Sequence, residues 1–600
     1  MANFLLVLDP DAIRRKAAAE KAHGRVAFLP RLKPELVLAS HYAITWAAAP
    51  HAPISRSVAE QDGGVDCVLF GEPHVDSGRL INAHALRNAH EMNWHERNRL
   101  NGFYCALILH PRHGARVEVD VLGMFPLYFW QNNEVTLIGT SPGLFRCHPS
   151  FQPSVDLHGV AGLLLTSGIV GGRTLLRGVR RLPADHTLLA APGTRVREVA
   201  PASAAIGPTV SNLDDAVEQA SALHLSFLKT ALSASREPGI QLSGGLDSRL
   251  LAGFTTSLKH RPTCLTFGRS GDLDARCARQ VAAELDLSPT LSDVEPADYA
   301  TYASSSVEWE QLSGGLYALP MGWNIAASPP ETPMDRMVCG LTLDAVIGGP
   351  KNVADTTQDL SFERLRVGRL GFDRQQLASL VAAPELLSAC DDVRAELLEH
   401  YRVAGPTDYL REWRMNLEHR HRFAVGACAW RYALFAWPVM PALDRRLIEL
   451  AQRLPYAVVK DRQLQTRMLI SRYPQLARLE LDRNYLDTKP LIGTKRSFMY
   501  DIRRRMVKLS RRCRAGLGHD PRFYVRTMEI NSPGWRVVRS LADEARPAAH
   551  TLFHQEELSR ILPKSPEKVR NIQDPIIHST PLKNTLGLML WMRQQARCAV

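Results

Sequence analysis

The 600-residue chain lacks several features that would place it in a class at once. It has no run of eighteen or more uncharged apolar residues, so we expect no membrane-spanning helix. No basic leader precedes the short apolar run near its start, so we expect no secretion signal. Its ten cysteines include no Cys-x-x-Cys pair, which argues against a zinc site and is typical of reduced thiols. These absences predict a cytoplasmic protein, with secretion and disulfides as the less favoured alternative.

Positively charged side chains outnumber negatively charged ones. The net charge is +12 and the pI is about 9.3, values that suit nucleic acid, an anionic membrane or an acidic substrate. Part of the excess is concentrated between Lys495 and Arg514. No recognised nucleic-acid module accompanies this segment, so a solvated basic helix face is favoured and we expect no nucleic-acid binding.

The length predicts two or more domains, because 600 residues exceed one ordinary core. The first third is β-rich and turn-rich, which predicts hairpins, and the stretch 190–208 has little periodicity, which predicts a linker. From about Phe362 the pattern is mostly helical. We expect one domain over residues 1–200 and a second over 210–600. The predicted strands of the first domain are 103–109, 117–121, 127–130 and 135–139.

The most informative segment is Ile240–Ser248, in which an apolar strand enters a Ser-Gly-Gly turn and a helical pattern follows. Adjacent glycines allow the N–H groups to turn inward, and the helix N-terminus adds partial positive charge, so the turn predicts an anion site. No Gly-x-x-x-x-Gly-Lys-Ser/Thr motif occurs, and the turn looks like the pyrophosphate loop of enzymes that split ATP into AMP and pyrophosphate. A second apolar strand at 263–268 completes a βαβ unit. This unit predicts a doubly wound parallel sheet with its ligand at the carboxyl ends of the strands.

Together with other segments, this loop resembles the asparagine synthetase family. The resemblance implies an α/β protein with an N-terminal Ntn-hydrolase-like αββα sandwich and a C-terminal doubly wound ATP-pyrophosphatase domain that ends in a helical part. The segments that carry the resemblance are Leu100–Ala106, Asp120–Tyr128, Arg173–Pro183, Ser243–Ser248, Gly340–Gly349 and Pro441–Asp444.

The departures from the family are also informative. Its glutamine-hydrolysing members use a cysteine that is exposed once the initiator Met is removed, whereas this chain has Ala2 and no cysteine in its first sixty residues. A methyl group cannot replace a thiolate nucleophile, so we expect an inactive glutaminase domain kept as a scaffold. Ala345 takes the place of an acidic neighbour of Asp344, and Trp437 stands where the family has Glu. We therefore expect a rebuilt pocket for the acceptor amine.

The resemblance implies ATP and Mg²⁺ as cofactors. Asp247 and Asp344 would hold Mg²⁺, although Asp344 as a simple helix N-cap is the alternative. Phe267 is expected to contact ATP, and a role in the apolar core alone is the alternative. Lys489, with Arg483 as substitute, is the candidate for stabilising the oxyanion, and a solvated lysine is the alternative. The residues expected to contact ATP are Leu242, Ser243, Gly244, Gly245, Leu246, Asp247, Ser248, Thr266, Phe267 and Gly340.

The segment Trp413–Arg422 is rich in His and Arg and invites a metal interpretation. His419 and His421 are two residues apart and would lie on different helix faces, so we expect no shared metal ion. Trp430 and Tyr432 are candidates for lining a substrate site, and buried core aromatics are the alternative.

Family members with an inactive N-terminal domain include lasso-peptide cyclases and β-lactam synthetases. The length and the altered acceptor motif favour the cyclases, which would make this protein an AMP-forming macrolactam synthetase. The expected partners are a ribosomal precursor peptide and a leader-removing protease. A β-lactam-type small-molecule cyclase and an ammonia-dependent asparagine synthetase are the alternatives. A non-catalytic nucleotide-binding regulator is the alternative from a different class.

Overall fold

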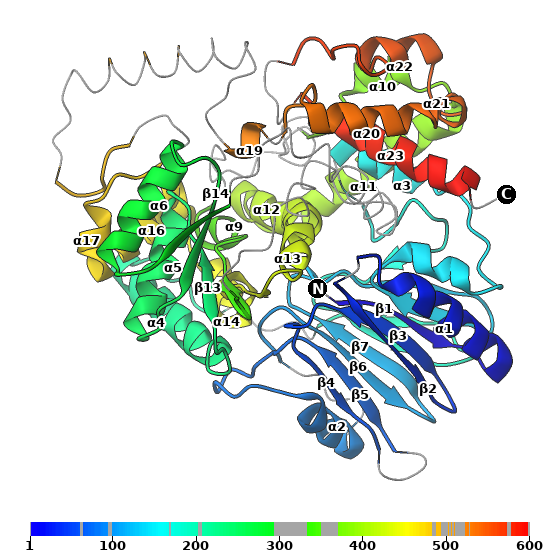
Figure 1. The fold of residues 1–600 in the computed structure, drawn as a ribbon, viewed down its shortest axis with the longest axis horizontal. Coiled ribbons are helices and arrows are strands. Elements are labelled where there is room, and N and C mark those ends of the chain that lie inside the picture. Colours follow the sequence, from blue (N-terminus) through cyan, green and yellow to red (C-terminus); the bar gives the residue numbers. More distant parts are fainter. Residues whose placement is uncertain are drawn as a thin grey trace.

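The structure is a computed structural model of the whole chain, and its fold is shown in Figure 1. Two antiparallel sheets formed by the first third of the chain lie at the lower right of this view. A parallel sheet with its helices lies at the left, and a group of helices lies at the upper right. The described residues are 2–29, 31–59, 64–93, 99–166, 168, 170–201, 207–292, 333–349, 370–482, 488–493, 502, 506, 509, 523–526, 528–572 and 578–597.

The N-terminal sandwich consists of two six-stranded antiparallel sheets. The order of the first sheet is β10-β8-β9-β1-β3-β2, with β1 Ala2–Leu8, β2 Lys33–Leu38, β3 Ala43–Ala48, β8 Tyr128–Gln131, β9 Thr136–Gly139 and β10 Arg180–Arg181. The order of the second is β12-β11-β7-β6-β5-β4, with β4 Ile54–Ser57, β5 Asp66–Phe70, β6 Cys105–His110, β7 Gly114–Val119, β11 Thr187–Ala190 and β12 Arg197–Val199.

Helices cover the outer faces of the two sheets. Helix α1 (Ala12–Val26) begins after Asp11, whose carboxylate accepts two N–H groups of the first turn, and it packs on β1, β2 and β3. Helix α2 (Ala83–Met92) packs on β4, β5 and β6. A short 3₁₀-helix (Pro142–Cys147) and α3 (Leu157–Thr166) complete this part. The arrangement is the αββα sandwich that the sequence analysis expects.

A five-stranded parallel sheet lies in the second part of the chain, with the order β15-β14-β13-β16-β17. The first strand in the sequence, β13, lies in the middle, so the order reverses there as in other doubly wound sheets. The strands are β13 Pro238–Gln241, β14 Thr263–Phe267, β15 Pro289–Ser292, β16 Arg336–Val338 and β17 Trp437–Val439. Among its helices are α4 Leu213–Ala231, α5 Leu246–Ser257, α6 Leu273–Glu284 and α9 Leu343–Ile347.

The described residues from 370 onward are mostly helical. Helix α23 packs on α20 and α21 and also on α3 of the sandwich. The helices are α10 Arg374–Leu380, α11 Pro384–Val403, α12 Asp408–Met415, the π-helix η5 Asn416–Val425, α13 Gly426–Tyr432, α14 Arg445–Gln452, α15 Tyr456–Val459, α16 Gln463–Arg472, α17 Pro474–Ala477, α19 Phe523–Arg526, α20 Pro533–Asp543, α21 Arg546–Ala549, α22 Gln555–Ile561 and α23 Thr580–Arg597. The described residues of this part also form two 3₁₀ turns, Pro441–Leu443 and Lys460–Arg462.

Most of the local predictions hold, with departures in the stretch 190–208 and in the helical C-terminal pattern. The four predicted hairpin strands appear as β6 to β9 within a few residues. The stretch 190–208 is not wholly a linker, because Arg197–Val199 forms β12 and pairs with β11 at the sandwich edge. The helical C-terminal pattern also contains β17, whose three residues complete the parallel sheet. A strand this short is set by its neighbour in the sheet rather than by its own periodicity.

The sandwich and the parallel-sheet part share one apolar cluster of buried side chains. Polar contacts reinforce this junction. The amide N–H of Gly102 donates to the Leu443 carbonyl at 3.2 Å, and the Arg445 guanidinium makes two 2.6 Å bonds to Asp185. The Trp437 indole donates to the Phe103 carbonyl at 3.2 Å. Two segments of the family resemblance therefore contact each other across the junction.

Candidate nucleotide site

Two loops meet at the point where the strand order of the parallel sheet reverses. Residues 242–245 leave the carboxyl end of β13, and residues 339–342 leave the carboxyl end of its neighbour β16. Gly340 approaches the first loop so closely that a Cβ at this position would lie 3.0 Å from the Asp247 Cβ. Ligands of doubly wound sheets bind in the crevice at such a reversal, so the fold brings the predicted ATP segments to the expected place.

The Ser-Gly-Gly turn is held in shape by its own serines. The Ser243 amide donates to Ser248 Oγ at 3.0 Å, the two hydroxyl oxygens lie 2.9 Å apart, and Ser248 Oγ donates to the Ser243 carbonyl at 3.0 Å. Gly245 is the N-cap of α5 and has no side chain with which to cap its first-turn N–H groups. A helix of twelve residues that begins in this way is suited to an anion at its N-terminus.

A carboxylate of the next helix lies against the turn. Asp274, in the first turn of α6, accepts the Gly244 N–H at 2.6 Å. A Cβ at Gly244 would lie 3.1 Å from the Asp274 carboxylate and 2.8 Å from the Cys277 Cβ, so the turn has room for glycine only. Burial, together with the nearby charges of Asp482 and Asp272, raises the pKa of Asp274 to about 7 although the Gly244 N–H lowers it.

The expected adenine-contacting residues lie on neighbouring strand ends. The Leu242 N–H donates to the Leu265 carbonyl at 2.9 Å, and the Thr266 hydroxyl donates to the Leu242 carbonyl at 2.7 Å. The ring of Phe267 stacks on Tyr432 with 6.2 Å between centroids and 5° between planes. The Tyr432 hydroxyl accepts a hydrogen bond from Gln241 at 3.0 Å. Leu242, Leu246, Phe267 and Tyr432 are all buried, so their packing roles hold with or without a nucleotide.

The two predicted metal ligands lie on either side of an arginine. One nitrogen of Arg462, Nη2, lies 2.6 Å from Asp247 Oδ2 and 3.6 Å from Asp344 Oδ2. Gln465 Nε2 donates to the other oxygen, Asp247 Oδ1. Burial and the charge of Asp344 raise the pKa of Asp247, whereas Arg462 and Gln465 lower it. Asp344 lies inside the first turn of α9, whose N-cap is Thr342, so it is not an N-cap.

Lys489 lies on a segment beside the loop. Thr488 accepts the Leu481 N–H at 3.3 Å, and the neighbouring Asp482 donates its own N–H to the Gly244 carbonyl at 3.0 Å. Arg249, buried in α5, holds the same stretch by donating to the carbonyl of Leu476 at 2.9 Å. Lys489 is part-buried, and its role stays a prediction. Arg483 lies outside the described residues.

The His- and Arg-rich segment forms a π-helix rather than the expected α-helix, over Asn416–Val425. His419 Nε2 lies 3.2 Å from His400 Nδ1, whereas His421 Nδ1 lies 3.2 Å from the hydroxyl of Thr342. The two histidines therefore face different neighbours, as predicted. Among the described residues no group of three or more His, Cys, Asp or Glu side chains is arranged to hold a metal ion.

The position of the family's cysteine nucleophile is buried in the sandwich. Ala2 is fully buried in β1, where it pairs with Ala48, and its carbonyl accepts the Trp430 indole N–H at 3.1 Å. Trp430 and Tyr432 are core residues, as the alternative interpretation held. The eight cysteines in the described part of the chain are buried and form no disulfides.

Three further side chains touch the loops and were missed by sequence reasoning: Arg462, Gln465 and Asp274. Arg462 and Gln465 are three residues apart and lie 215 and 218 residues beyond the aspartate they contact. An arginine and a glutamine in a polar helical segment carry no local signal of this role. Acidic residues are common in the first turn of helices, so the sequence alone does not indicate that Asp274 also contacts the loop.

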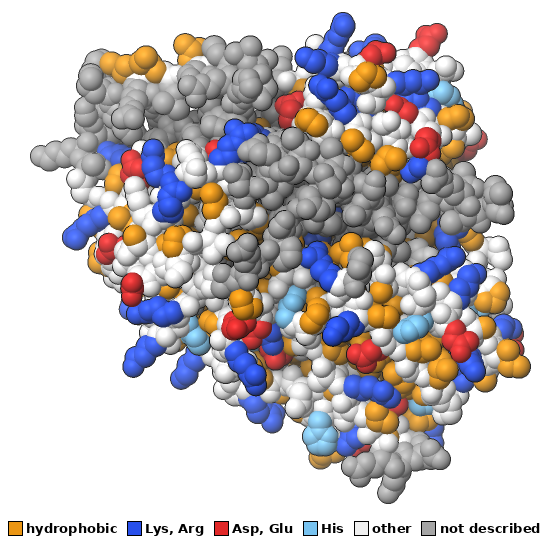
Figure 2. Space-filling model, in the orientation of Figure 1, with side chains coloured by type: hydrophobic (Ala, Val, Ile, Leu, Met, Phe, Trp, Pro, Cys, Tyr) orange, Lys and Arg blue, Asp and Glu red, His pale blue; other side chains and the backbone are white. Residues whose placement is uncertain are grey.

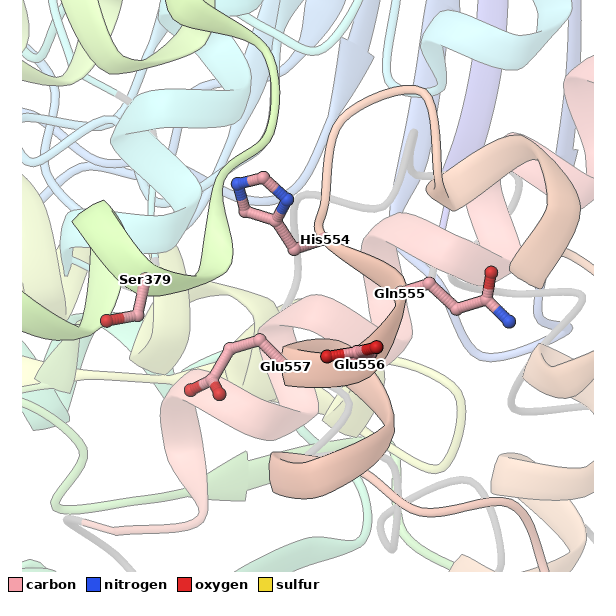
Figure 3. A pocket seen from close by; sticks show the side chains of 5 residues that line it. All are labelled: Ser379, His554, Gln555, Glu556 and Glu557. Carbon is pink, nitrogen blue, oxygen red and sulfur yellow. The ribbon is translucent and has the colours of Figure 1, made fainter.

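Other surface features lie away from these loops. A pocket of about 530 Å³ lies between α10 and α22, and none of the predicted residues lines it. Figure 3 shows the side chains that do, which are Ser379, His554, Gln555, Glu556 and Glu557. Lys and Arg side chains are spread over the face seen in Figure 2 rather than gathered in one patch. Within the described residues no helix is long and apolar enough to cross a membrane.

Comparison with known proteins supports the expected family. Residues 223–320 match the asparagine synthase family model, a match that includes the Ser-Gly-Gly loop and β14. The match supports ATP-dependent carbon–nitrogen ligase chemistry in broad terms, with ATP, typically used with Mg²⁺, as the cofactor of the family. No curated protein matches the chain.

Similar solved structures were also found. One is the glutamine phosphoribosylpyrophosphate amidotransferase from B. subtilis complexed with ADP and GMP, at 9% identity and a TM-score of 0.21, covering 48% of this chain and 65% of that one. Another is the allosteric regulatory enzyme of purine biosynthesis, at 8% identity and a TM-score of 0.20, covering 49% of this chain and 81% of that one. The chain thus spans just under two thirds of the first structure, and likenesses this weak carry no functional information.

Proposed function

We propose that this protein is an ATP-dependent, AMP-forming ligase that closes a macrolactam in a peptide. The observation that carries the ligase proposal is the meeting of the Ser243–Ser248 loop with Gly340 at the reversal point of the parallel sheet. The loop lies within residues 223–320, which match the asparagine synthase family model. A turn rich in N–H groups at a helix N-terminus suits pyrophosphate. The absence of the Walker-type lysine favours splitting at the α-phosphate.

The proposed reaction has two steps. An oxygen of an Asp or Glu side-chain carboxylate in the peptide attacks the α-phosphorus of ATP, and the bond to the bridging oxygen breaks, so pyrophosphate leaves with the electron pair. The peptide's N-terminal amine then attacks the acyl-adenylate carbonyl, loses a proton, and displaces AMP. The product has lost one water relative to the linear peptide. Positioning and charge neutralisation supply most of the help that such steps need.

The proposed roles of the residues follow from their positions in the site. The loop Ser243–Ser248 would hold the β- and γ-phosphates, and Arg462 stands beside it with a positive charge. Leu242, Thr266 and Phe267 would line the adenine side. Lys489, on the segment that contacts the loop through Asp482, would stabilise the oxyanion of the second step. Asp247 and Asp344 are the predicted ligands of Mg²⁺.

Two observations support a peptide amine as the nucleophile rather than ammonia from glutamine. Position 2 carries a buried alanine whose carbonyl accepts a hydrogen bond from Trp430, so the sandwich has no thiol at this position. The Trp437 side chain, at the family's Glu position, packs into the junction on Phe103 with 5.6 Å between ring centroids. An acceptor group would therefore need a pocket different from the family's.

The test is a mass spectrum. The full chain would be incubated with Mg-ATP, the protease expected beside it and a candidate precursor peptide. We expect the trimmed peptide to lose one water while AMP and pyrophosphate form. Formation of AMP with an unchanged peptide mass would refute the peptide substrate and favour a small-molecule cyclase. No nucleotide consumption would refute the ligase and favour a nucleotide-binding regulator.

Matched variants would tie the activity to the loop. Asp247→Ala should reduce pyrophosphate release at least about a hundredfold, because it removes a carboxylate from the centre of the site. Asp286→Asn is the control, because Asp286 is exposed at the far end of α6 and Asn tolerates its positive φ of 53°. Equal loss in both variants would indicate a general defect and not a site effect.

A further inference from the structure

The carboxylates of Asp247 and Asp344 share an arginine. Arg462 Nη2 lies 2.6 Å from Asp247 Oδ2 and 3.6 Å from Asp344 Oδ2. An arginine guanidinium stays charged in proteins at any physiological pH.

The backbone holds this arginine in an uncommon conformation. Asp461 and Arg462 have φ values of 53° and 61°, so two consecutive non-glycine residues are left-handed immediately before α16 begins. Left-handed backbone is unfavourable for such residues, and where it occurs it clusters at functional sites. Arg462 is the last residue of the 3₁₀ turn and the N-cap of α16, and its side chain reaches the two carboxylates. Gln465, three residues later in α16, donates to the second oxygen of Asp247.

This arrangement does not fit a Mg²⁺ ion shared between the two carboxylates. Both oxygens of Asp247 accept hydrogen bonds, one from Arg462 and one from Gln465. A cationic group already lies between the aspartates, and a second cation there would meet its charge at close range. Gln465 is fully buried, so its side chain has little room to turn away from Asp247.

We propose that Arg462 is a built-in cation of this site, which takes the place of a metal ion between Asp247 and Asp344. Only the role of this cation in catalysis rests on the proposed function. When ATP binds, the Arg462 guanidinium is the positive charge that faces the departing pyrophosphate. A planar, permanently charged fork suits phosphate oxygens as well as carboxylates. Mg²⁺ would then enter the site as a complex with ATP, because the two aspartates do not bind it before the nucleotide arrives.

The test counts metal sites without requiring catalysis. The full chain, free of nucleotide, would be titrated with Mn²⁺, and the free ion measured by electron paramagnetic resonance. We expect the wild type to bind no Mn²⁺ below millimolar concentrations. Arg462→Gln should gain one site with an affinity at least tenfold higher, because it leaves two carboxylates without their cation. The double variant Arg462→Gln with Asp344→Asn should lose that site again.

Two matched variants complete the design. Arg467→Gln changes an exposed arginine of the same helix that pairs with Asp214, and it should bind Mn²⁺ as the wild type does. Arg462→Lys keeps the positive charge and should also gain no site. Submillimolar Mn²⁺ binding by the nucleotide-free wild type would overturn the inference, even if Arg462→Gln failed to fold. A folded Arg462→Gln that gains no site would overturn it as well.

The same titration separates this inference from the proposed function. The Mn²⁺ titration is made without ATP, so its outcome does not depend on whether the wild type forms AMP. If AMP forms and the nucleotide-free wild type binds Mn²⁺ tightly, the ligase stands and the built-in cation is wrong. If no nucleotide is consumed yet the Arg462→Gln site appears, the proposed function is wrong and the charge replacement stands.

Discussion

The indole N–H of Trp430 donates to the carbonyl oxygen of Ala2 across 3.1 Å, and both residues are fully buried. The bond joins the first strand of the sandwich to α13 of the second part, 428 residues apart in the chain. The position that would carry a catalytic cysteine in a glutamine-hydrolysing relative is therefore part of the junction between the two parts. This relationship bears on both stability and chemistry.

Replacing Trp430 by Phe should destabilise the protein by about 2–4 kcal/mol, because it removes a buried hydrogen bond, leaves the Ala2 carbonyl unsatisfied and opens a cavity. Thermal unfolding followed by circular dichroism measures the change in midpoint. Trp130→Phe is the control, since Trp130 is only half-buried. An unchanged midpoint in Trp430→Phe would contradict the structural importance of this bond.

Restoring the cysteine alone should not restore glutaminase activity. A thiol in Ala2→Cys would be fully buried in β1, where no glutamine can reach it. Glutamate release from glutamine measures the outcome, with heat-inactivated protein as the blank. Glutamate formation well above the blank would show that the sandwich is a competent glutaminase lacking only its nucleophile.

Asp274→Asn should strengthen ATP binding in a pH-dependent way. With a pKa of about 7 this carboxyl is mostly protonated at pH 5.5 and charged at pH 8, where it opposes the phosphates. The variant keeps an acceptor for the Gly244 N–H, so we expect about three- to tenfold tighter ATP binding at pH 8 and little difference at pH 5.5. Isothermal titration calorimetry at the two pH values, with Asp286→Asn as control, checks this.

The same carboxyl should also affect stability. Its folded-state pKa lies above the unfolded value of 3.8, so its contribution is fully present below pH 3.8 and is lost as the pH rises through about 7. Relative to the wild type, Asp274→Asn should therefore gain stability as the pH is raised from 5.5 to 8. A difference that did not change with pH would argue against the raised pKa.

Gly340→Ala should lower AMP formation about tenfold with little change in stability. The added Cβ would lie 3.0 Å from the Asp247 Cβ, so the aspartate must shift by a few tenths of an ångström. Gly271→Ala is the control, because nothing lies within 4 Å of a Cβ there. Steady-state kinetics with ATP separates the two variants, and equal rates would show that the approach of the loops is not needed for turnover.

Lys489→Gln should reduce the amide-forming step more than adenylation if this lysine stabilises the oxyanion, because a positive charge there matters most in the second step. The ratio of product to pyrophosphate released measures the uncoupling. Lys568→Gln, an exposed lysine on another segment, is the control. A loss of pyrophosphate release equal to the loss of product would assign Lys489 to the first step instead.

The sequence by itself determined the features that depend on near neighbours. Alternating apolar runs predicted the hairpin strands, and the Ser-Gly-Gly motif predicted a tight loop between a strand and a helix, because both patterns are set by local backbone chemistry. Anion binding by that loop stays a prediction. The βαβ spacing predicted the parallel sheet. The family resemblance supplied the order of the two parts and the residues of the second loop.

Tertiary structure decided what depends on distant partners. Only the folded chain brings Arg462 and Gln465 to Asp247, places Asp274 on the Gly244 N–H, and adds β17 to the sheet edge. It also turned the His- and Arg-rich helix into a π-helix and joined β12 to the sandwich. These contacts join residues up to hundreds of positions apart, and their energies come from burial and charge pairing that no local pattern records.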